Sequence, residues 1–147
     1  MEKELNKVVL SLGSNIGKRK ENLALAYQYV KKYIGKIVKF SSIYENPSQG
    51  FDSNNDFMNS CIAIETTYQC REILHKIHRI EGAMGRTRTK EGYEDRIIDI
   101  DIIFYNNQIF DEDGLKVPHP KYHERDFVLI PLNELNFLKD PRQKFQA

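Results

Sequence analysis

The spacing of hydrophobic and polar residues along the chain predicts four strands and two helices. Short runs rich in β-branched and aromatic residues predict strands at residues 7–12, 36–46, 56–67 and 96–105. Apolar residues recur at helical spacing over residues 20–33 and 70–85. Gly13, Ser14 and Asn15 predict the turn that ends the first strand. We expect Gly35 to end the first helix as a C-cap and Thr66 or Thr67 to cap the second.

The order βαββαβ favours an α+β fold of the ferredoxin-like type. In this fold a sheet with antiparallel pairs carries two helices on one face. Farther along, the pattern predicts a small hairpin around residues 106–114, a Pro-bounded turn at 117–120 and a short helix near residues 125–135. The length is close to the commonest domain size, so we expect residues 1–147 to form a single domain.

Composition narrows the classes of protein to consider. The 147 residues are 40% hydrophobic and 29% charged, with eight Tyr and eight Phe, which is typical of a globular chain. A net charge of +1 gives no overall field that would attract nucleic acid or an anionic membrane. No stretch has the ~20 apolar residues of a membrane span. We therefore expect a cytoplasmic protein, a monomer by default, that binds neither nucleic acid nor membranes.

The two cysteines, Cys61 and Cys70, have neither CxxC spacing nor a histidine partner pattern. Metal binding and redox chemistry at these positions are therefore not predicted. We interpret both as structural residues of a protein in a reducing compartment.

Two aspartates, Asp99 and Asp101, lie one residue apart in the last predicted strand. Alternation puts apolar residues on the face under the helices, namely Ile98, Ile100, Ile102 and Phe104. Both aspartates then share the opposite face, about 6.6 Å apart along the strand, where carboxylates repel unless cations lie between them. Such oxygen ligands suit Mg²⁺, particularly when substrate phosphates complete its coordination. The alternative is an exposed acidic pair neutralised by nearby Lys or Arg.

Cationic residues surround these aspartates in the sequence. The segment GRTRTKEGYEDR supplies Arg86, Arg88, Lys90 and Arg96 directly before the strand, and VPHPKYHER follows it. Guanidinium groups bind phosphate oxygens bidentately, so aspartates and arginines together indicate a nucleotide polyphosphate. A solvated charge run is the simpler alternative. Phosphoryl transfer requires mainly positioning and charge neutralisation, which these residues could supply.

Several motifs occur in one order along the chain: SLGSN, FMNS, RIE followed by GRTR, RIIDIDI, and VPHPKYHERDFVLIPL. From about residue 7 to residue 137 the chain resembles the 6-hydroxymethyl-7,8-dihydropterin pyrophosphokinase family of folate biosynthesis. The combination of R-x-x-D-x-D with V-P-H-P and H-E-R-x-F makes a chance match improbable. The resemblance implies the ferredoxin-like fold. It also implies transfer of the β,γ-pyrophosphoryl group of ATP to the pterin hydroxymethyl, with release of AMP.

The resemblance further implies how ATP is bound. Asp99 and Asp101 match the ligands of two Mg²⁺ ions that arrive with ATP and bridge its phosphates to the acceptor hydroxyl. Together with the two aspartates, Arg86 and Arg96 are implied as catalytic residues. The residues implied in ATP binding are His78, Glu81, Arg86, Arg88, Arg96, Ile102, His119 and Arg125. The acceptor of the hydroxyl proton stays open between a carboxylate such as Asp101 and water.

The pterin site follows from the same resemblance. Asn59 matches a side chain that hydrogen-bonds the heterocycle, and Phe57 and Phe127 match an aromatic pair that encloses it, an arrangement in which stacking adds to area burial. The full set implied in pterin binding is Asn46, Pro47, Phe57, Asn59, Tyr93, Asp99 and Phe127. Ordinary core packing is the alternative for either phenylalanine.

The chain departs from the family pattern at two places. His78 stands where the family commonly has Gln, and we expect it to keep one hydrogen bond. Glu94 and Asp95 stand where a Gly-Pro pair often precedes the arginine of the metal strand. We expect these two carboxylates to weaken nucleotide affinity.

Two other classes of protein fit parts of the pattern. A ferredoxin-like RNA-binding module would need stacking aromatics and a basic sheet face, whereas the exposed strand positions here are acidic. Another Mg²⁺-dependent nucleotidyl or phosphoryl transferase could use the same pair of aspartates. AMP as the product would distinguish the pyrophosphokinase from that second class.

Overall fold

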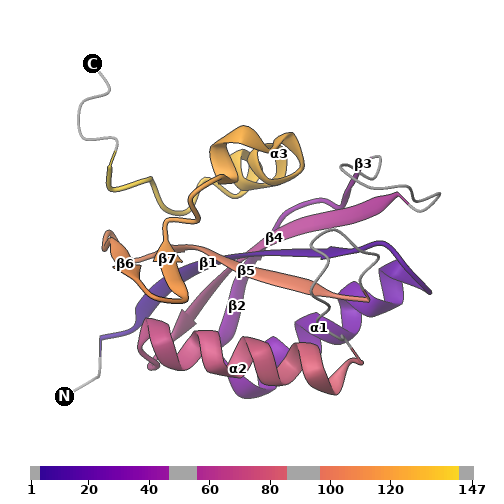
Figure 1. Ribbon diagram of the computed structural model, residues 1–147, viewed down its shortest axis with the longest axis horizontal. Coiled ribbons are helices and arrows are strands. Elements are labelled where there is room, and N and C mark those ends of the chain that lie inside the picture. Colours follow the sequence, from indigo (N-terminus) through magenta and orange to yellow (C-terminus); the bar gives the residue numbers. More distant parts are fainter. Residues whose placement is uncertain (1–3, 47–55, 86–96, 143–147) are drawn as a thin grey trace.

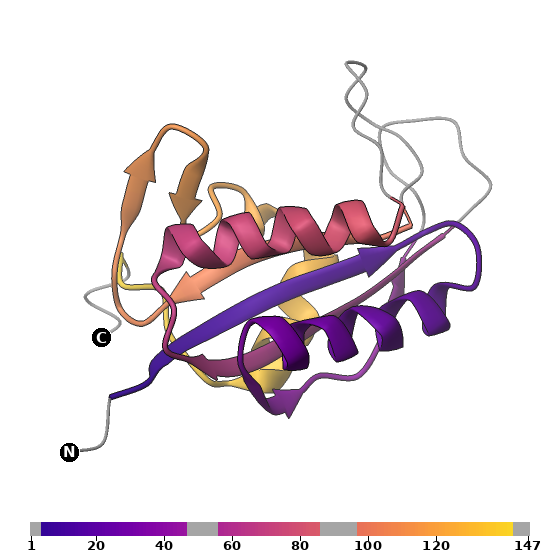
Figure 2. The same ribbon diagram turned by 90° about the horizontal axis from the view of Figure 1, so that it is seen from below.

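The computed structural model describes residues 4–46, 56–85 and 97–142, and a β-sheet with helices on both faces forms its centre (Figures 1 and 2). The sheet runs in the order β2 (Lys36–Phe40), β4 (Phe57–Thr66), β1 (Asn6–Ser14) and β5 (Asp99–Tyr105). Every neighbouring pair is antiparallel, and the short β3 (Tyr44–Asn46) also pairs with β4. This order confirms the βαββαβ arrangement predicted from the sequence.

Helices α1 (Arg19–Tyr33) and α2 (Cys70–Ala83) cover one face of the sheet, as predicted, and α3 (Asp126–Leu135) covers part of the other (Figures 1 and 2). The predicted hairpin is present as β6 (Phe110–Glu112) and β7 (Leu115–Val117), and a 3-10 turn, η1 (Tyr122–Glu124), leads from it to α3. None of the helices in the described part of the chain is long and apolar enough to cross a membrane.

Two apolar layers hold this arrangement together. The larger layer lies between the sheet and the first two helices, where Leu23 and Val30 of α1 and Ile73 and Ile77 of α2 are fully or almost fully buried. The smaller layer lies under α3, whose Val128, Leu132 and Leu135 pack with five sheet residues: Val9, Cys61, Ala63, Ile103 and Phe104. Burial of this apolar surface is the main driving force for the three-layer structure.

The face predicted for Phe104 is wrong. Val9 pairs with Phe104 and Leu10 pairs with Ile102, so Ile103 is an extra residue in β5, a β-bulge. The bulge interrupts the alternation, and Ile103 and Phe104 both pack in the layer under α3. Ile98, Ile100 and Ile102 lie on the α1 and α2 face as predicted.

The predicted strand over residues 36–46 is two strands, β2 and β3, because residues 41–43 between them belong to neither. The predicted turn at Gly13 is also wrong, since β1 continues through Ser14. A local signal for a turn is overridden here by pairing of β1 with strands on both sides.

The predicted helix caps differ from those observed. The N-cap of α2 is Gln69, whose backbone N–H donates to Glu72 Oε1 at 2.9 Å. Thr66 instead donates to the Ile34 carbonyl. The C-cap of α1 is Ile34, and Gly35 follows it. Gly35 is needed because a Cβ there would lie 2.4 Å from the Glu65 carbonyl oxygen.

Both cysteines are buried and form no disulfide. Burial raises the pKa of each thiol to about 12, so neither forms a thiolate near neutral pH. These observations support the structural role predicted for both.

The close approach at Gly35 gives a stability prediction. We expect Gly35→Ala to lower the free energy of unfolding by about 2 kcal/mol, because the new methyl group meets a backbone atom of β4. Gly82→Ala is the matched control, since a Cβ at this α2 position meets nothing within 4 Å. It should stabilise the protein by about 0.5 kcal/mol through helix propensity. Urea denaturation measures both; equal effects would contradict the prediction.

Candidate active site

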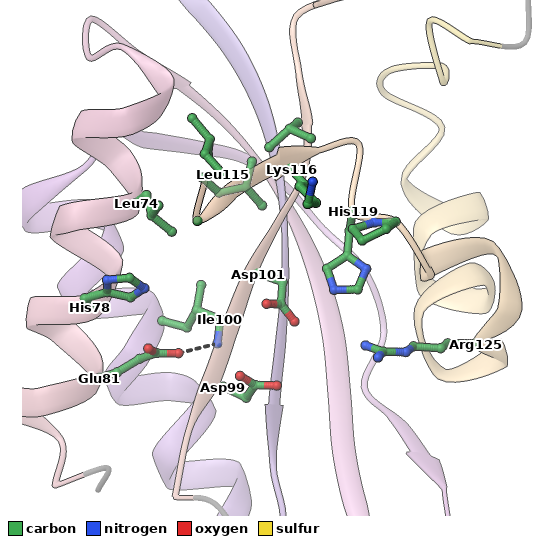
Figure 3. A pocket seen from close by; sticks show the side chains of 14 residues that line it. Leu74, His78, Glu81, Asp99, Ile100, Asp101, Leu115, Lys116, His119 and Arg125 are labelled. Atoms are coloured by element: carbon green, nitrogen blue, oxygen red, sulfur yellow. Dashed lines mark hydrogen bonds between the residues drawn. The ribbon is translucent and has the colours of Figure 1, made fainter. Parts of the chain in front are cut away.

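A cleft of about 440 Å³ lies along the outer edge of β5 (Figure 3). Helix α2 contributes Leu74, His78 and Glu81; β5 contributes residues 99–102; and β7 with the segment after it contributes Leu115, Lys116, His119 and Arg125. The cleft therefore brings together seven of the predicted site residues: His78, Glu81, Asp99, Asp101, Ile102, His119 and Arg125.

Glu81 fixes the position of β5 relative to α2. The side chain is only 3% exposed, and Oε2 accepts a hydrogen bond from the Ile100 N–H at 2.9 Å (Figure 3). Because β5 is at the edge of the sheet, this N–H points away from β1 and requires another acceptor. Glu81 thus supports the strand between Asp99 and Asp101.

Asp99 and Asp101 lie on the face of β5 that is opposite to α2, as predicted. The register pairs Asp101 with Ser11 and Asp99 with Gly13 on β1, so these four residues occupy the same sheet face as the layer under α3. Figure 3 shows both carboxylates on the side of β5 that faces His119 and Arg125. Two carboxylates are thus placed opposite cationic and hydrogen-bonding side chains.

His119 is placed as a neutral hydrogen-bond donor. Burial lowers its pKa to about 4; Arg125 acts in the same direction and Asp99 against it. The backbone N–H of Lys121 donates to His119 Nδ1 at 3.2 Å, which assigns the ring proton to Nε2. At neutral pH the ring can donate from Nε2 to an anionic ligand without adding a charge.

A polar network around the buried Asp140 holds the segment that leads to Arg125. Arg125 is the N-cap of α3, and its guanidinium carbon lies 5.8 Å from the centre of the Phe127 ring. In η1, Tyr122 donates from its hydroxyl to Asp140 Oδ2 at 2.6 Å. Arg142 donates to both oxygens of the same carboxylate, at 3.0 and 2.7 Å. This network anchors the segment between His119 and Arg125.

A second set of predicted residues lies farther along the same sheet face. Asn59 of β4 pairs with Gly13, which pairs with Asp99, so Asn59 and Asp99 are two strands apart, or roughly 10 Å. Phe57 lies two residues before Asn59 on the same side of β4. A Cβ at position 13 would lie 2.6 Å from Asn59 Oδ1 and 3.6 Å from Phe57 Cδ1. Asn59 therefore lies over Gly13, beside Phe57.

The other residues predicted for the site are Phe127, Asn46 and five that lie outside the described part of the chain. Phe127 is in the first turn of α3 and is partly buried against the layer below. Asn46 is in β3, where its backbone pairs with Phe57. Five predicted site residues lie outside the described residues: Pro47, Arg86, Arg88, Tyr93 and Arg96.

Two residues of the site, Gly13 and Lys116, are not among those predicted from the sequence. Gly13 was interpreted as a turn signal, whereas its lack of a side chain is what admits Asn59. Lys116 was not predicted, yet it lines the cleft, and its Nζ lies 2.5 Å from Asp111 Oδ1 across the hairpin. The alternation of apolar and polar residues in Leu115, Lys116 and Val117 could have indicated this position, because it leaves only the lysine exposed.

The donor set limits what kind of metal the cleft could hold. Within residues 4–46, 56–85 and 97–142, no three His, Cys, Asp or Glu side chains are grouped as a metal site. Zinc sites of the usual kind need three or four such ligands. Mg²⁺ is usually held by one or two carboxylates, with water and substrate phosphates as its other ligands. Asp99 and Asp101 fit this second pattern.

Comparisons with known proteins agree on one family. A sequence model of the 7,8-dihydro-6-hydroxymethylpterin-pyrophosphokinase (HPPK) family matches residues 9–137. The 2-amino-4-hydroxy-6-hydroxymethyldihydropteridine pyrophosphokinase of Porphyromonas gingivalis is 37% identical over 131 residues, which cover 87% of this chain and 89% of the relative. The protein of the same name from Helicobacter pylori is 40% identical over 131 residues, covering 86% and 79%.

Solved structures support the fold. The crystal structure of wild-type HPPK-DHPS from Plasmodium falciparum matches 95% of this chain with a TM-score of 0.73 and 18% sequence identity. This chain spans 43% of that longer protein. At this identity the similarity concerns the ferredoxin-like fold alone.

The bond from Ile100 to Glu81 gives the first prediction for the site. Glu81→Ala should lower the free energy of unfolding by about 1–3 kcal/mol, because a buried N–H loses its acceptor. Glu81→Gln keeps an oxygen acceptor, so its free energy of unfolding should fall by less. Hydrogen exchange at the Ile100 amide should become faster in the alanine variant alone. Unchanged protection there in Glu81→Ala would contradict this role.

The Asp140 network gives a pH prediction. Burial raises the pKa of Asp140, but hydrogen bonds from Arg142 and Tyr122 outweigh it and lower that pKa to about 2. The carboxylate thus stabilises the fold above its unfolded pKa of about 4, and this contribution is lost as the pH falls towards 2. The free energy of unfolding of the wild type should exceed that of Asp140→Asn by about 2 kcal/mol at pH 7 and by much less near pH 2. Urea denaturation at each pH measures this difference, and the same difference at every pH would contradict the prediction.

Proposed function

The chain belongs to the 7,8-dihydro-6-hydroxymethylpterin-pyrophosphokinase family, and we propose that the cleft along β5 is the site of its reaction. The reaction transfers the β,γ-pyrophosphoryl group of ATP to the hydroxymethyl oxygen of 6-hydroxymethyl-7,8-dihydropterin in folate biosynthesis. The products are AMP and the pterin pyrophosphate. The observation that carries the assignment is the pair Asp99 and Asp101, which faces His119 and Arg125 across a single cleft (Figure 3).

In this proposal Asp99 and Asp101 hold two Mg²⁺ ions together with the ATP phosphates. Both side chains are partly exposed on the cleft side of β5, and two carboxylates with substrate oxygens are a donor set that Mg²⁺ accepts. The ions would neutralise charge on the transferred group and orient the attacking and leaving oxygens. Together with the phosphates, they would also offset the repulsion between the two carboxylates.

The nucleotide lies along the edge of β5. Since the Ile100 N–H points outward to Glu81, the period of an antiparallel pair directs the Ile102 N–H and C=O outward as well. One donor and one acceptor on the edge of the sheet suit the base of ATP. His119 donates from Nε2 and Arg125 supplies a guanidinium, both suited to phosphate oxygens. Lys116 adds a cation at the hairpin side of the cleft.

The pterin lies at the opposite end of the same sheet face. Asn59 offers an amide beside the flat surface that Gly13 leaves, and Phe57 provides an aromatic ring next to it. Phe127 approaches from the first turn of α3. A pterin bound there would direct its hydroxymethyl group along the sheet toward Asp99, the residue in the same row as Gly13.

This arrangement accounts for direct transfer between the two substrates. The hydroxymethyl oxygen forms a bond to the β-phosphorus of ATP while the bond from that phosphorus to the α-phosphate bridging oxygen breaks. AMP leaves, and the hydroxyl proton passes to a carboxylate such as Asp101 or to water. Asp99 and Asp101 lie between the two substrate positions, where positioning and charge neutralisation contribute most to such a transfer.

Product analysis tests the proposal. Purified protein with ATP, Mg²⁺ and 6-hydroxymethyl-7,8-dihydropterin should form AMP only when the pterin is present. Asp101→Asn should lower kcat by about 100-fold or more, because removing one metal-binding charge weakens stabilisation of the transition state. Chelation of Mg²⁺ should abolish turnover in the wild type.

Asp113→Asn is the control, because it removes an exposed carboxylate from the β6–β7 turn and should retain normal turnover. Near-normal turnover by Asp101→Asn would exclude that residue as a metal ligand or base. ADP or pyrophosphate in place of AMP would indicate a different transferase reaction.

A further inference from the structure

Helix α1 begins with an arginine that bonds to two separate strand ends. Arg19 Nη1 donates to Glu45 Oε1 at 3.2 Å and to the Asp56 carbonyl oxygen at 2.6 Å. Glu45 is the middle residue of β3, and Asp56 directly precedes β4. One guanidinium therefore connects α1 to both of these strands.

The strands at both ends carry residues of the proposed pterin site on the sheet face beyond the cleft. Glu45 pairs with Met58, which is buried in the layer under α1 and α2, so these two residues occupy the helix face of the sheet. Phe57 and Asn59 alternate with Met58 and occupy the cleft face. Arg19 thus bonds, on the helix face of the sheet, to the backbone that places Phe57 and Asn59 on the opposite face.

The strand β3 needs such support because it is short. It has three residues and, within the described residues, pairs only with β4. Ahead of β3, the Ser42 N–H and hydroxyl both donate to Glu134 Oε1 of α3, at 2.8 Å each. The strand is therefore tied to α3 on one side and to α1, through Arg19, on the other.

The start of α1 also holds the end of β1. Asn22 Nδ2 donates to Ser14 Oγ at 3.2 Å and to the Ile16 carbonyl oxygen at 2.9 Å. Ser14 directly follows Gly13, the residue that Asn59 covers. The first turn of α1 thus fixes three strand ends around the same part of the cleft.

We propose that Arg19 is a positioning residue for the pterin substrate. By joining Glu45 to the Asp56 carbonyl, it sets the spacing of β3 and the start of β4, and with it the placement of Phe57 and Asn59. In this proposal Arg19 acts through its bonds to Glu45 and Asp56, from the helix face of the sheet, and not by touching either substrate. The inference rests on the proposed function, because it takes the part of the sheet face with Phe57 and Asn59 as the pterin site.

The chain contains a closely matched control. Arg71 lies in the first turn of α2 and also donates to a glutamate and a carbonyl, Glu112 Oε2 at 2.7 Å and the Asp113 oxygen at 3.4 Å. That contact joins α2 to the β6–β7 hairpin, away from Phe57 and Asn59. Both arginine side chains are partly exposed, 28% for Arg19 and 43% for Arg71.

The experiment compares Arg19→Met with Arg71→Met, because methionine keeps an apolar stem and removes the guanidinium. For Arg19→Met we expect the KM for the pterin to rise about fivefold, while kcat and the KM for ATP stay within about twofold of wild type. Arg71→Met should leave the KM for the pterin unchanged. Glu45→Gln keeps an oxygen acceptor for Arg19 and should behave like the wild type. Thermal denaturation of each variant reports whether it is folded.

Three results would overturn the inference. The first is an unchanged pterin KM in a folded Arg19→Met variant. The second is an equal rise in the pterin KM of Arg71→Met. The third is a fall in kcat and a rise in both KM values that accompany a lower melting temperature. Absence of AMP formation by the wild-type protein would instead refute the proposed function.

Discussion

The alternation of side chains along β5 is the constraint on which the site depends. One face of this edge strand must pack under α2, so Ile100 and Ile102 are buried there, and Asp99 and Asp101, which alternate with them, are directed to the other face. Asp99 and Asp101 can therefore stand side by side without entering the core. Glu81 completes the arrangement by accepting the outward N–H of Ile100 between them. A single buried carboxylate thus stabilises the strand that presents two others.

The opposite sheet face changes character along its length, and the length of α3 follows this change. The row of Val9, Ala63 and Phe104 is apolar and lies in the layer under α3. Asp101 and Asp99, farther along β5 on this face, are polar and line the open cleft. Because α3 covers only the apolar part, the fold leaves a polar surface between the two proposed substrate positions. The hydrophobic effect therefore determines where the site can be.

How much the sequence could predict follows from the range of each interaction. Alternation and helical spacing are local, so the strand order and the shared face of the two aspartates could be predicted. The bulge at Ile103 and the close approach of Asn59 to Gly13 arise from pairing between strands, which single-strand patterns do not contain. Gln69 was missed as a cap because two threonines are stronger N-cap types. The roles of the cleft residues came from the family resemblance, and the positions found for them support it.

The account's central claim is that Asp99 and Asp101 hold the cations that join ATP to the pterin. Anomalous scattering from crystals grown with Mn²⁺ and a non-hydrolysable ATP analogue tests it most directly, because Mn²⁺ occupies oxygen sites of the Mg²⁺ type. The account predicts anomalous peaks within about 2.3 Å of the Asp99 and Asp101 carboxylate oxygens and of the phosphates. Peaks located elsewhere, with the two carboxylates contacting only protein atoms, would contradict it.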